Sequence, residues 1–189
     1  MSETMEIRWH SRAGQGAMTA GQALAEIIGT TGKYVQAYPD YGAEKRGAPM
    51  CVYNRISDVP IRKRCGVTTP NHVIVLDPTV LATVDVTEGM KDNGYVILNT
   101  RKAPEDVKGS MGCDHVATLD ASGIAKETIG GDFPNVPATG ALVRIAGMMP
   151  IDDFCLLLRK FMEKRYYGRD NIINGNVAAA RRGFEEVKF

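Results

Sequence analysis

Apolar and polar residues along this chain follow two periods, that of short strands and that of amphipathic helices. Residues 6–10 are predicted to form a strand. Residues 17–28 are predicted to form a helix whose apolar face includes Ala20, Leu24 and Ile27 at helical spacing. Further strands are predicted over residues 34–37, 50–56, 61–65, 72–76, 95–99 and 116–119. Further helices are predicted over residues 79–90, 121–128, 141–148, 152–167 and 171–187.

This order of elements predicts an α/β fold. Strands and helices alternate from residue 72 onward, which is typical of βαβ units with parallel strands. Residues 57–60 carry turn-forming side chains between two extended runs, so one β-hairpin is expected and the sheet is not purely parallel. The prediction is a three-layer fold with a mixed, mostly parallel sheet, one β-hairpin and a helical C-terminus, in a single domain over residues 1–189.

Composition and charge narrow the class of protein. The 189 residues include 23 Lys and Arg against 22 Asp and Glu, a formal net charge of +1. This balance argues against the broad basic footprint of a nucleic-acid-binding protein. No apolar run approaches the length of a membrane span, and the N-terminus has neither the basic nor the apolar region of a signal peptide. A cytoplasmic protein without a membrane segment is therefore expected.

The cysteines are Cys51, Cys65, Cys113 and Cys155, at wide and irregular separations. No C-x-x-C pair occurs and no histidine is placed to complete a zinc site. The spacing also lacks the C-x-x-C runs that hold iron–sulfur clusters. Reduced thiols, with no metal bound by this chain, are expected.

The first predicted strand is followed by a glycine-containing turn, Arg12-Ala13-Gly14-Gln15-Gly16, and then directly by the first helix. Such a turn gathers free backbone N–H groups at the positive end of a helix, where a phosphate or carboxylate can bind. The spacing is not a dinucleotide fingerprint, because Thr19 stands at the third glycine position, and no Walker pattern follows. Turn geometry alone is the competing interpretation of these glycines.

A second segment, residues 38–49, combines charged residues, glycines and prolines with Tyr38 and Tyr41. The turn, this segment, the run Gly140-Ala141-Leu142-Val143-Arg144 and residues 181–187 together resemble the gamma subunits of pyruvate:ferredoxin oxidoreductases. More broadly, they resemble the gamma family of thiamine-dependent 2-oxoacid:acceptor oxidoreductases. The resemblance runs from about Glu6 to Lys188, with several unrelated motifs in matching order.

The resemblance implies a multisubunit enzyme that decarboxylates a 2-oxoacid oxidatively to acyl-CoA and CO2. Its cofactors are thiamine diphosphate with Mg²⁺ and [4Fe-4S] clusters, with coenzyme A as co-substrate. The implied partners are alpha, beta and ferredoxin-like delta subunits, and the electron acceptor is ferredoxin, or NAD through a further subunit. This sequence has no run typical of a thiamine diphosphate metal site, so the isolated chain is expected to be inactive. It is expected to cover the active site, dock subunits and help coenzyme A to enter.

The residues expected to contact coenzyme A or a partner are Arg12, Gly14, Gln15, Gly16, Glu44, Arg46, Thr139 and Gly140. Arginine suits this role because it binds phosphate with two donors. Thr139 and Gly140 precede a predicted helix and would offer a second helix N-terminus. Subunit packing is the competing interpretation for each position. No catalytic residue and no metal ligand are expected in this chain.

Pyruvate is the default substrate, and an aromatic or branched 2-oxoacid such as phenylglyoxylate or 2-oxoisovalerate is the alternative within the family. A free-standing nucleotide- or coenzyme A-binding module is the alternative from another class. A hydrolase using Ser11 and His10 is disfavoured, because adjacent residues of a strand point to opposite faces.

Overall fold

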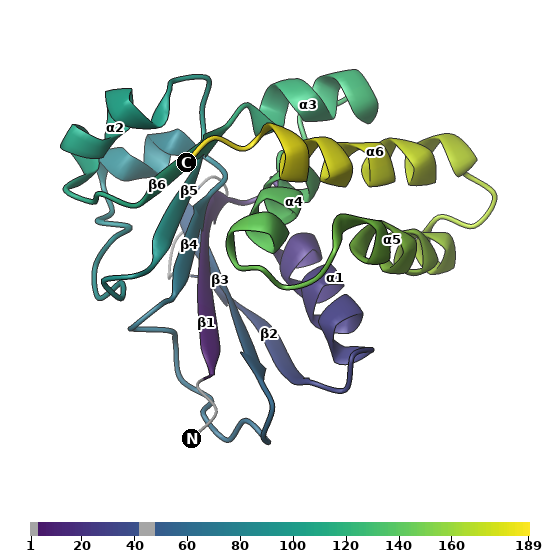
Figure 1. The fold of residues 1–189 in the computed structure, drawn as a ribbon, viewed down its shortest axis with the longest axis horizontal. Helices are drawn as coiled ribbons and strands as arrows, with labels where there is room; N and C mark the ends of the chain where they lie inside the picture. Colours follow the sequence, from purple (N-terminus) through teal and green to yellow (C-terminus); the bar gives the residue numbers. More distant parts are fainter. Residues whose placement is uncertain (1–3, 42–47) are drawn as a thin grey trace.

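The computed structural model describes residues 4–41 and 48–189, which form a sheet with helices on both faces (Figure 1). The strands are β1 (Met5–Arg12), β2 (Tyr34–Tyr41), β3 (Pro49–Ser57), β4 (His72–Val75), β5 (Tyr95–Asn99) and β6 (Val116–Leu119). The helices are α1 (Ala17–Gly29), α2 (Pro104–Met111), α3 (Ala121–Thr128), α4 (Asn135–Ile145), α5 (Ile151–Arg165) and α6 (Asp170–Glu186), with a short 3-10 helix η1 (Pro78–Ala82).

The strand order in the described sheet is β2-β3-β1-β4-β5-β6. The neighbours β1, β4, β5 and β6 are parallel, whereas β3 runs antiparallel to both β1 and β2. The predicted α/β fold with a mixed, mostly parallel sheet and a helical C-terminus is confirmed. Within these residues, no helix combines the length and the apolar character that a membrane span needs.

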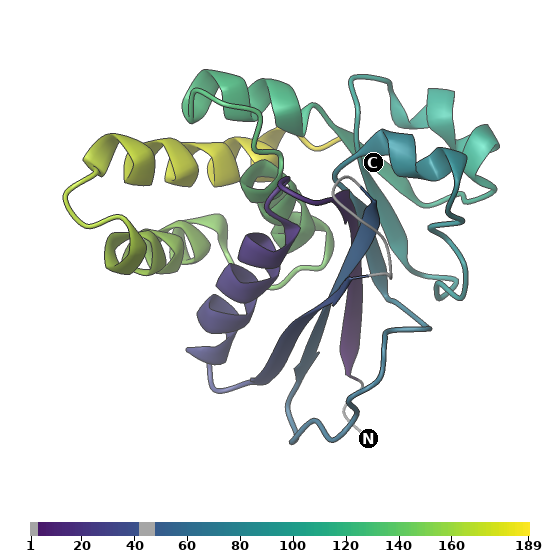
Figure 2. The ribbon, with the colours of Figure 1, turned by 180° about the vertical axis from the view of Figure 1, so that it is seen from behind.

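The two faces of the sheet have separate apolar cores. α1, α3, α4, α5 and α6 cover one face, where Trp9, Leu24, Leu142 and Phe154 are fully buried in the larger core (Figure 2). η1 and α2 lie against the other face, and Val80 of η1 packs with strand valines in the smaller core. Because side chains alternate along each strand, one strand supplies residues to both cores.

The predicted hairpin between residues 50–56 and 61–65 is wrong. The hairpin is formed by β2 and β3, and residues 61–65 have no regular structure. The carbonyl groups of Cys65 and Gly66 instead accept hydrogen bonds from the buried Arg55 guanidinium, at 2.8 and 3.1 Å. A buried side chain thus replaces a strand neighbour as the partner of this backbone.

The helix predicted over residues 79–90 is also wrong, since only the short η1 forms there. Asp85 accepts hydrogen bonds from the backbone and the hydroxyl of Thr87 at 2.9 and 2.6 Å, and such local bonds compete with a helix. Conversely, α2 was not predicted, although Pro104 at its start and Glu105 in its first turn are ordinary N-terminal signals.

Candidate functional site

The turn between β1 and α1 requires glycine and is closed by its own glutamine. Gly14 and Gly16 have φ angles of 99° and 80°, in the left-handed region that side chains disfavour. The backbone N–H of Arg12 donates to Gln15 Oε1 at 2.8 Å, and the N–H of Gln15 donates to the Arg12 carbonyl at 3.3 Å. Gln15 therefore shapes the turn, in addition to any contact it makes outside it.

The same turn is tied to the segment that follows β4. Gln15 Nε2 donates to Asp77 Oδ2 at 2.8 Å, and Arg12 Nε donates to Thr79 Oγ1 at 2.9 Å. Burial disfavours ionisation of Asp77, but hydrogen bonds from Thr79 and Gln15 and the Arg12 charge outweigh it and lower the pKa of that carboxyl. An ionised Asp77 thus anchors the turn at the carboxyl ends of β1 and β4.

The N-terminus of α1 lies at this turn without a carboxylate of its own. Gly16 is the N-cap and makes no side-chain capping bond, and the first turn of α1 contains no acidic residue. The Gly16 carbonyl accepts from Asn135 Nδ2 at 3.2 Å, which joins the starts of α1 and α4. A Cβ on Gly16 would stand 2.7 Å from that nitrogen, so packing also requires glycine. The positive helix end suits an anion.

The connection between β2 and β3 leaves the sheet beside this turn. Pro49, at the start of β3, pairs with Arg12, and Met50 pairs with both Ser11 and Tyr41. Both ends of the connection therefore lie at the same edge of the sheet as the turn. Glu44 and Arg46, predicted to contact a ligand or partner, lie outside the described residues.

The helix N-terminus predicted at Thr139 and Gly140 is wrong. α4 begins four residues earlier, at Asn135, and Pro137 is compatible with this start because proline is tolerated in the first turn of a helix. Thr139 is 4% exposed and donates its hydroxyl to the Asn135 carbonyl inside the helix, at 2.8 Å. A Cβ on Gly140 would stand 1.9 Å from the Ala180 carbonyl of α6, so this glycine permits close helix packing.

His10 and Ser11 point to opposite faces of the sheet, as expected for neighbours in a strand. His10 Nδ1 lies 3.5 Å from Cys51 Sγ on one face, whereas Ser11 is fully buried opposite Met50, a residue of the larger core on the other. Burial, aided by the charge of Arg8, lowers the pKa of His10 to about 4. The imidazole is therefore neutral and does not pair with the serine.

Sequence reasoning missed a layer of buried polar side chains on the His10 face of the sheet. Glu6, Arg8 and Arg55 are at most 8% exposed. Arg8 donates to the carbonyls of Val86 and Glu88 at 2.9 and 2.8 Å. The strict alternation of polar and apolar residues from Glu6 to His10 was the available signal.

No group of three or more His, Cys, Asp or Glu in residues 4–41 and 48–189 could hold a metal ion. All four cysteines are free thiols, and Cys155 is buried. The described part of this chain thus offers neither a cluster nor a metal centre.

This chain is similar to known proteins in both sequence and structure. Residues 6–186 match the family described as Pyruvate ferredoxin/flavodoxin oxidoreductase. The chain is 44% identical over 184 residues to pyruvate synthase subunit PorC of Thermotoga maritima, covering 97% of this chain and 94% of that protein. It is 40% identical over 187 residues to the pyruvate/ketoisovalerate oxidoreductases common subunit gamma of Pyrococcus abyssi, covering 98% of each. A crystal structure of the Thermotoga maritima pyruvate oxidoreductase subunit PORC superimposes with a TM-score of 0.86 at 42% identity, covering 98% of each chain.

Proposed function

Because this chain belongs to the pyruvate ferredoxin/flavodoxin oxidoreductase family as a gamma subunit, we propose that it covers the active site of a coenzyme A-dependent 2-oxoacid oxidoreductase. In this role it docks neighbouring subunits and helps coenzyme A to enter. The complex converts a 2-oxoacid, with pyruvate as the default, to acyl-CoA and CO2, and the electrons go to iron–sulfur clusters. The isolated chain has no activity in this proposal.

The turn between β1 and α1 carries the proposal. Its N-cap residue, Gly16, has no capping side chain, the first turn of α1 has no acidic residue, and Asp77 fixes the turn in place through Gln15. The connection containing Glu44 and Arg46 leaves the sheet next to Arg12, since Pro49 pairs with that residue. A phosphate of coenzyme A suits this site, because oriented N–H groups and arginine both favour phosphate.

Thiamine diphosphate with Mg²⁺ and the [4Fe-4S] clusters belong to partner subunits in this proposal. The described residues of this chain do not fit either group, because they contain no cluster of metal-ligating side chains. The partners are an alpha and a beta subunit around the thiamine cofactor and a ferredoxin-like delta subunit around the clusters. Ferredoxin, or NAD through a further subunit, accepts the electrons.

The substrate is proposed to be selected by subunits other than this one. The relative in Pyrococcus abyssi is named as a gamma subunit common to pyruvate and ketoisovalerate oxidoreductases. A gamma chain of this kind therefore serves enzymes for two 2-oxoacids, which supports a role in covering and docking. Pyruvate, 2-oxoisovalerate and phenylglyoxylate are the substrates to compare.

The first experiment is to purify the complex through an affinity tag on this chain in its native host. Mass spectrometry is expected to find a thiamine-binding partner, and the visible spectrum is expected to be that of iron–sulfur clusters. A panel of 2-oxoacids then identifies the substrate. A colourless chain without partners would contradict the subunit role and favour the free-standing coenzyme A-binding module, which predicts binding by the isolated chain.

The contact with coenzyme A is tested in the purified complex with Arg12→Ala and Arg46→Ala. Each is expected to raise the KM for coenzyme A about tenfold, since a charge-assisted contact is lost, with little change in the KM for the 2-oxoacid. Arg62→Ala, an exposed change on the segment between β3 and β4, is the matched control. Unchanged values with normal assembly would contradict this placement of coenzyme A.

A further inference from the structure

Open α/β sheets bind ligands outside the carboxyl ends of parallel strands, where neighbouring strands send their connections to opposite faces. The described sheet has two such places. β1 leads to α1 on the face of the larger core, whereas its neighbour β4 leads to η1 on the other face. β5 leads to α2, whereas its neighbour β6 leads to α3, again on opposite faces (Figures 1 and 2).

The two crevices differ in what occupies them. Side chains of the protein bridge the first crevice, because Gln15 bonds to Asp77 and Arg12 bonds to Thr79 across it. The second crevice holds a cavity of about 410 Å³. Residues 100–102 line it from the connection after β5, and residues 118–120 line it from the end of β6.

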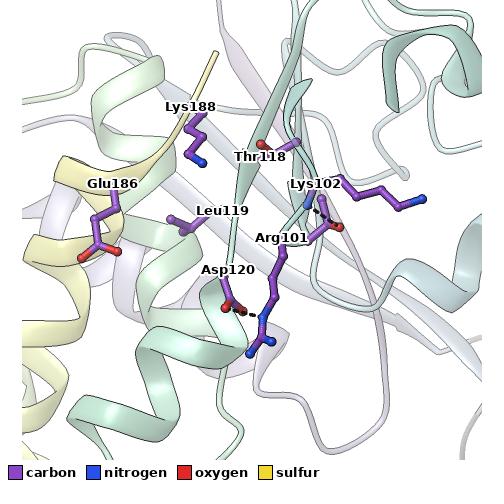
Figure 3. A pocket seen from close by; sticks show the side chains of 8 residues that line it. Arg101, Lys102, Thr118, Leu119, Asp120, Glu186 and Lys188 are labelled. Atoms are coloured by element: carbon purple, nitrogen blue, oxygen red, sulfur yellow. Dashed lines mark hydrogen bonds and ion pairs between the residues drawn. The ribbon is translucent and has the colours of Figure 1, made fainter. Parts of the chain in front are cut away.

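The C-terminal segment forms one wall of this β5–β6 crevice. Thr118 N–H donates to the Lys188 carbonyl at 2.8 Å, and Lys188 N–H donates to the Thr118 carbonyl at 3.0 Å. This pairing lays the segment against β6, the edge strand of the sheet. In Figure 3 the Lys188 ammonium extends toward Leu119, whereas the Lys102 side chain lies on the opposite side of the strand end and points away from Lys188.

The charges of the β5–β6 crevice leave two lysines uncompensated. Asp120 is paired with Arg101 at 2.7 Å, and Glu186 is paired with Arg182. Neither Lys102 nor Lys188 forms an ion pair with any residue in the described part of the chain. The crevice is thus positive, although its lining contains two carboxylates.

A threonine hydroxyl completes the set of donors. Thr100 Oγ1 accepts from the Lys102 backbone N–H at 3.3 Å, which leaves the hydroxyl proton available to a ligand. Thr118 also lines the cavity but is only 1% exposed, so Thr100 supplies the hydroxyl that a ligand can reach. Ammonium and hydroxyl donors together suit phosphate oxygens, whereas they offer no specific contact to an apolar ligand.

From this geometry we infer that the β5–β6 crevice binds a phosphate-bearing small molecule of about nucleotide size, at a site separate from the turn after β1. Its volume falls within the ~300–1,000 Å³ of typical small-molecule sites. Coenzyme A and free nucleotides both carry this chemistry. The inference does not depend on the contact proposed at Arg12.

The test is a calorimetric titration of the full chain at low salt with inorganic pyrophosphate, ADP and coenzyme A. Lys102→Ala with Lys188→Ala is expected to weaken pyrophosphate binding about tenfold or more, because charge-assisted hydrogen bonds are lost. Lys63→Ala with Lys160→Ala removes the same charge from other exposed positions and is expected to leave binding unchanged. Amide NMR shifts on adding pyrophosphate are expected to centre on Thr100 and Thr118.

Tighter binding of coenzyme A than of ADP identifies the acyl carrier as the ligand, and the reverse order identifies a nucleotide. The inference is overturned if the wild-type chain does not bind pyrophosphate, or if both double variants weaken binding equally. Arg12→Ala separates the two sites. If it abolishes pyrophosphate binding, the anion sits at the β1 turn and the inference is overturned, whereas retained binding supports the β5–β6 crevice.

Discussion

Arg55 Nε lies 2.6 Å from Glu6 Oε1, and the two side chains are only 1% and 6% exposed. The guanidinium also donates to the Tyr38 hydroxyl at 2.6 Å and to the carbonyls of Cys65 and Gly66. One buried cation thus joins β1, β2 and β3 to the segment that covers them. Pairing of the whole guanidinium is important for the stability of the fold, because burying a charge without partners costs free energy of folding.

Arg55→Ala is expected to lower the free energy of unfolding by about 3–5 kcal/mol, since the Glu6 carboxylate is left buried without its partner. Urea unfolding monitored by circular dichroism measures the change. Arg101→Ala is the control, because the Arg101–Asp120 pair is equally short at 2.7 Å but 82% and 37% exposed. Exposed pairs contribute up to about 1 kcal/mol. Equal losses in both variants would contradict the role of burial.

This ion pair also explains where sequence reasoning failed. Residues 61–65 are predicted as a strand from local pattern, yet the partners of their backbone carbonyls are side chains of β2 and β3, which local pattern does not report. By contrast, β5, β6 and α3 have the predicted bounds. Their signals are local, namely continuous apolar runs and the capping residue Asp120, whose Oδ1 accepts from Gly123 N–H at 2.9 Å.

A second relationship, between α4 and α6, depends on two glycines. A Cβ on Gly140 would stand 1.9 Å from the Ala180 carbonyl, and a Cβ on Gly183 would stand 1.9 Å from the Pro137 carbonyl. Gly140→Ala is therefore expected to lower the free energy of unfolding by about 1–3 kcal/mol through overpacking. Thermal and urea unfolding of the full chain measure it.

Gly109→Ala in α2 is the matched control for that prediction. A Cβ at Gly109 meets no atom within 4 Å, and alanine is the better helix former, so about 0.5–1 kcal/mol of stabilisation is expected. Destabilisation of both variants to the same extent would show that helix packing is not the cause.

The same contacts explain why Gly140, predicted as a ligand contact, serves packing: a motif does not distinguish a glycine needed for a ligand from one needed for a helix neighbour.

The candidate site was predictable only in part. The turn at residues 12–16 follows from a strand, two glycines and a helix in immediate succession, and the structure places it at the carboxyl end of β1. Its anchor, Asp77, lies 62 residues after Gln15 in the sequence. No local pattern links such residues, because only the parallel pairing of β1 with β4 brings them together.

Acidification is expected to destabilise the fold between pH 6.5 and about 4. Burial lowers the pKa of both His10 and His72 from 6.5 to about 4, and the Arg8 charge adds to the effect at His10. In this pH range the unfolded chain binds protons at the two histidines, whereas the folded chain does not. The stability that the two neutral imidazoles contribute is therefore fully present above pH 6.5 and decreases as the pH falls through this window. The loss approaches about 3 kcal/mol for each histidine.

Urea unfolding at a series of pH values measures this dependence. His72→Gln is expected to flatten the curve between pH 6.5 and 4, with the exposed His115→Gln as the matched control. His10→Gln is expected to flatten it further, since the two sites are separate. An unchanged slope in His72→Gln would show that this imidazole is protonated in the folded chain.

Asp77 is predicted to order the turn through Gln15 as well as to cap η1. Its Oδ1 accepts from the Thr79 backbone N–H at 2.9 Å, while its Oδ2 accepts from Gln15 Nε2 at 2.8 Å.

Asp77→Asn keeps an oxygen for the cap but presents an amide nitrogen to the Gln15 donor, so it separates the two roles. Asp77→Ala removes both and is expected to cost about 1 kcal/mol of stability through the lost cap. Both variants are expected to accelerate amide hydrogen exchange at Gln15 and Gly16, whereas Asp77→Asn retains most of the stability. If exchange at the turn increases in Asp77→Ala alone, the cap and not the Gln15 bond orders the turn.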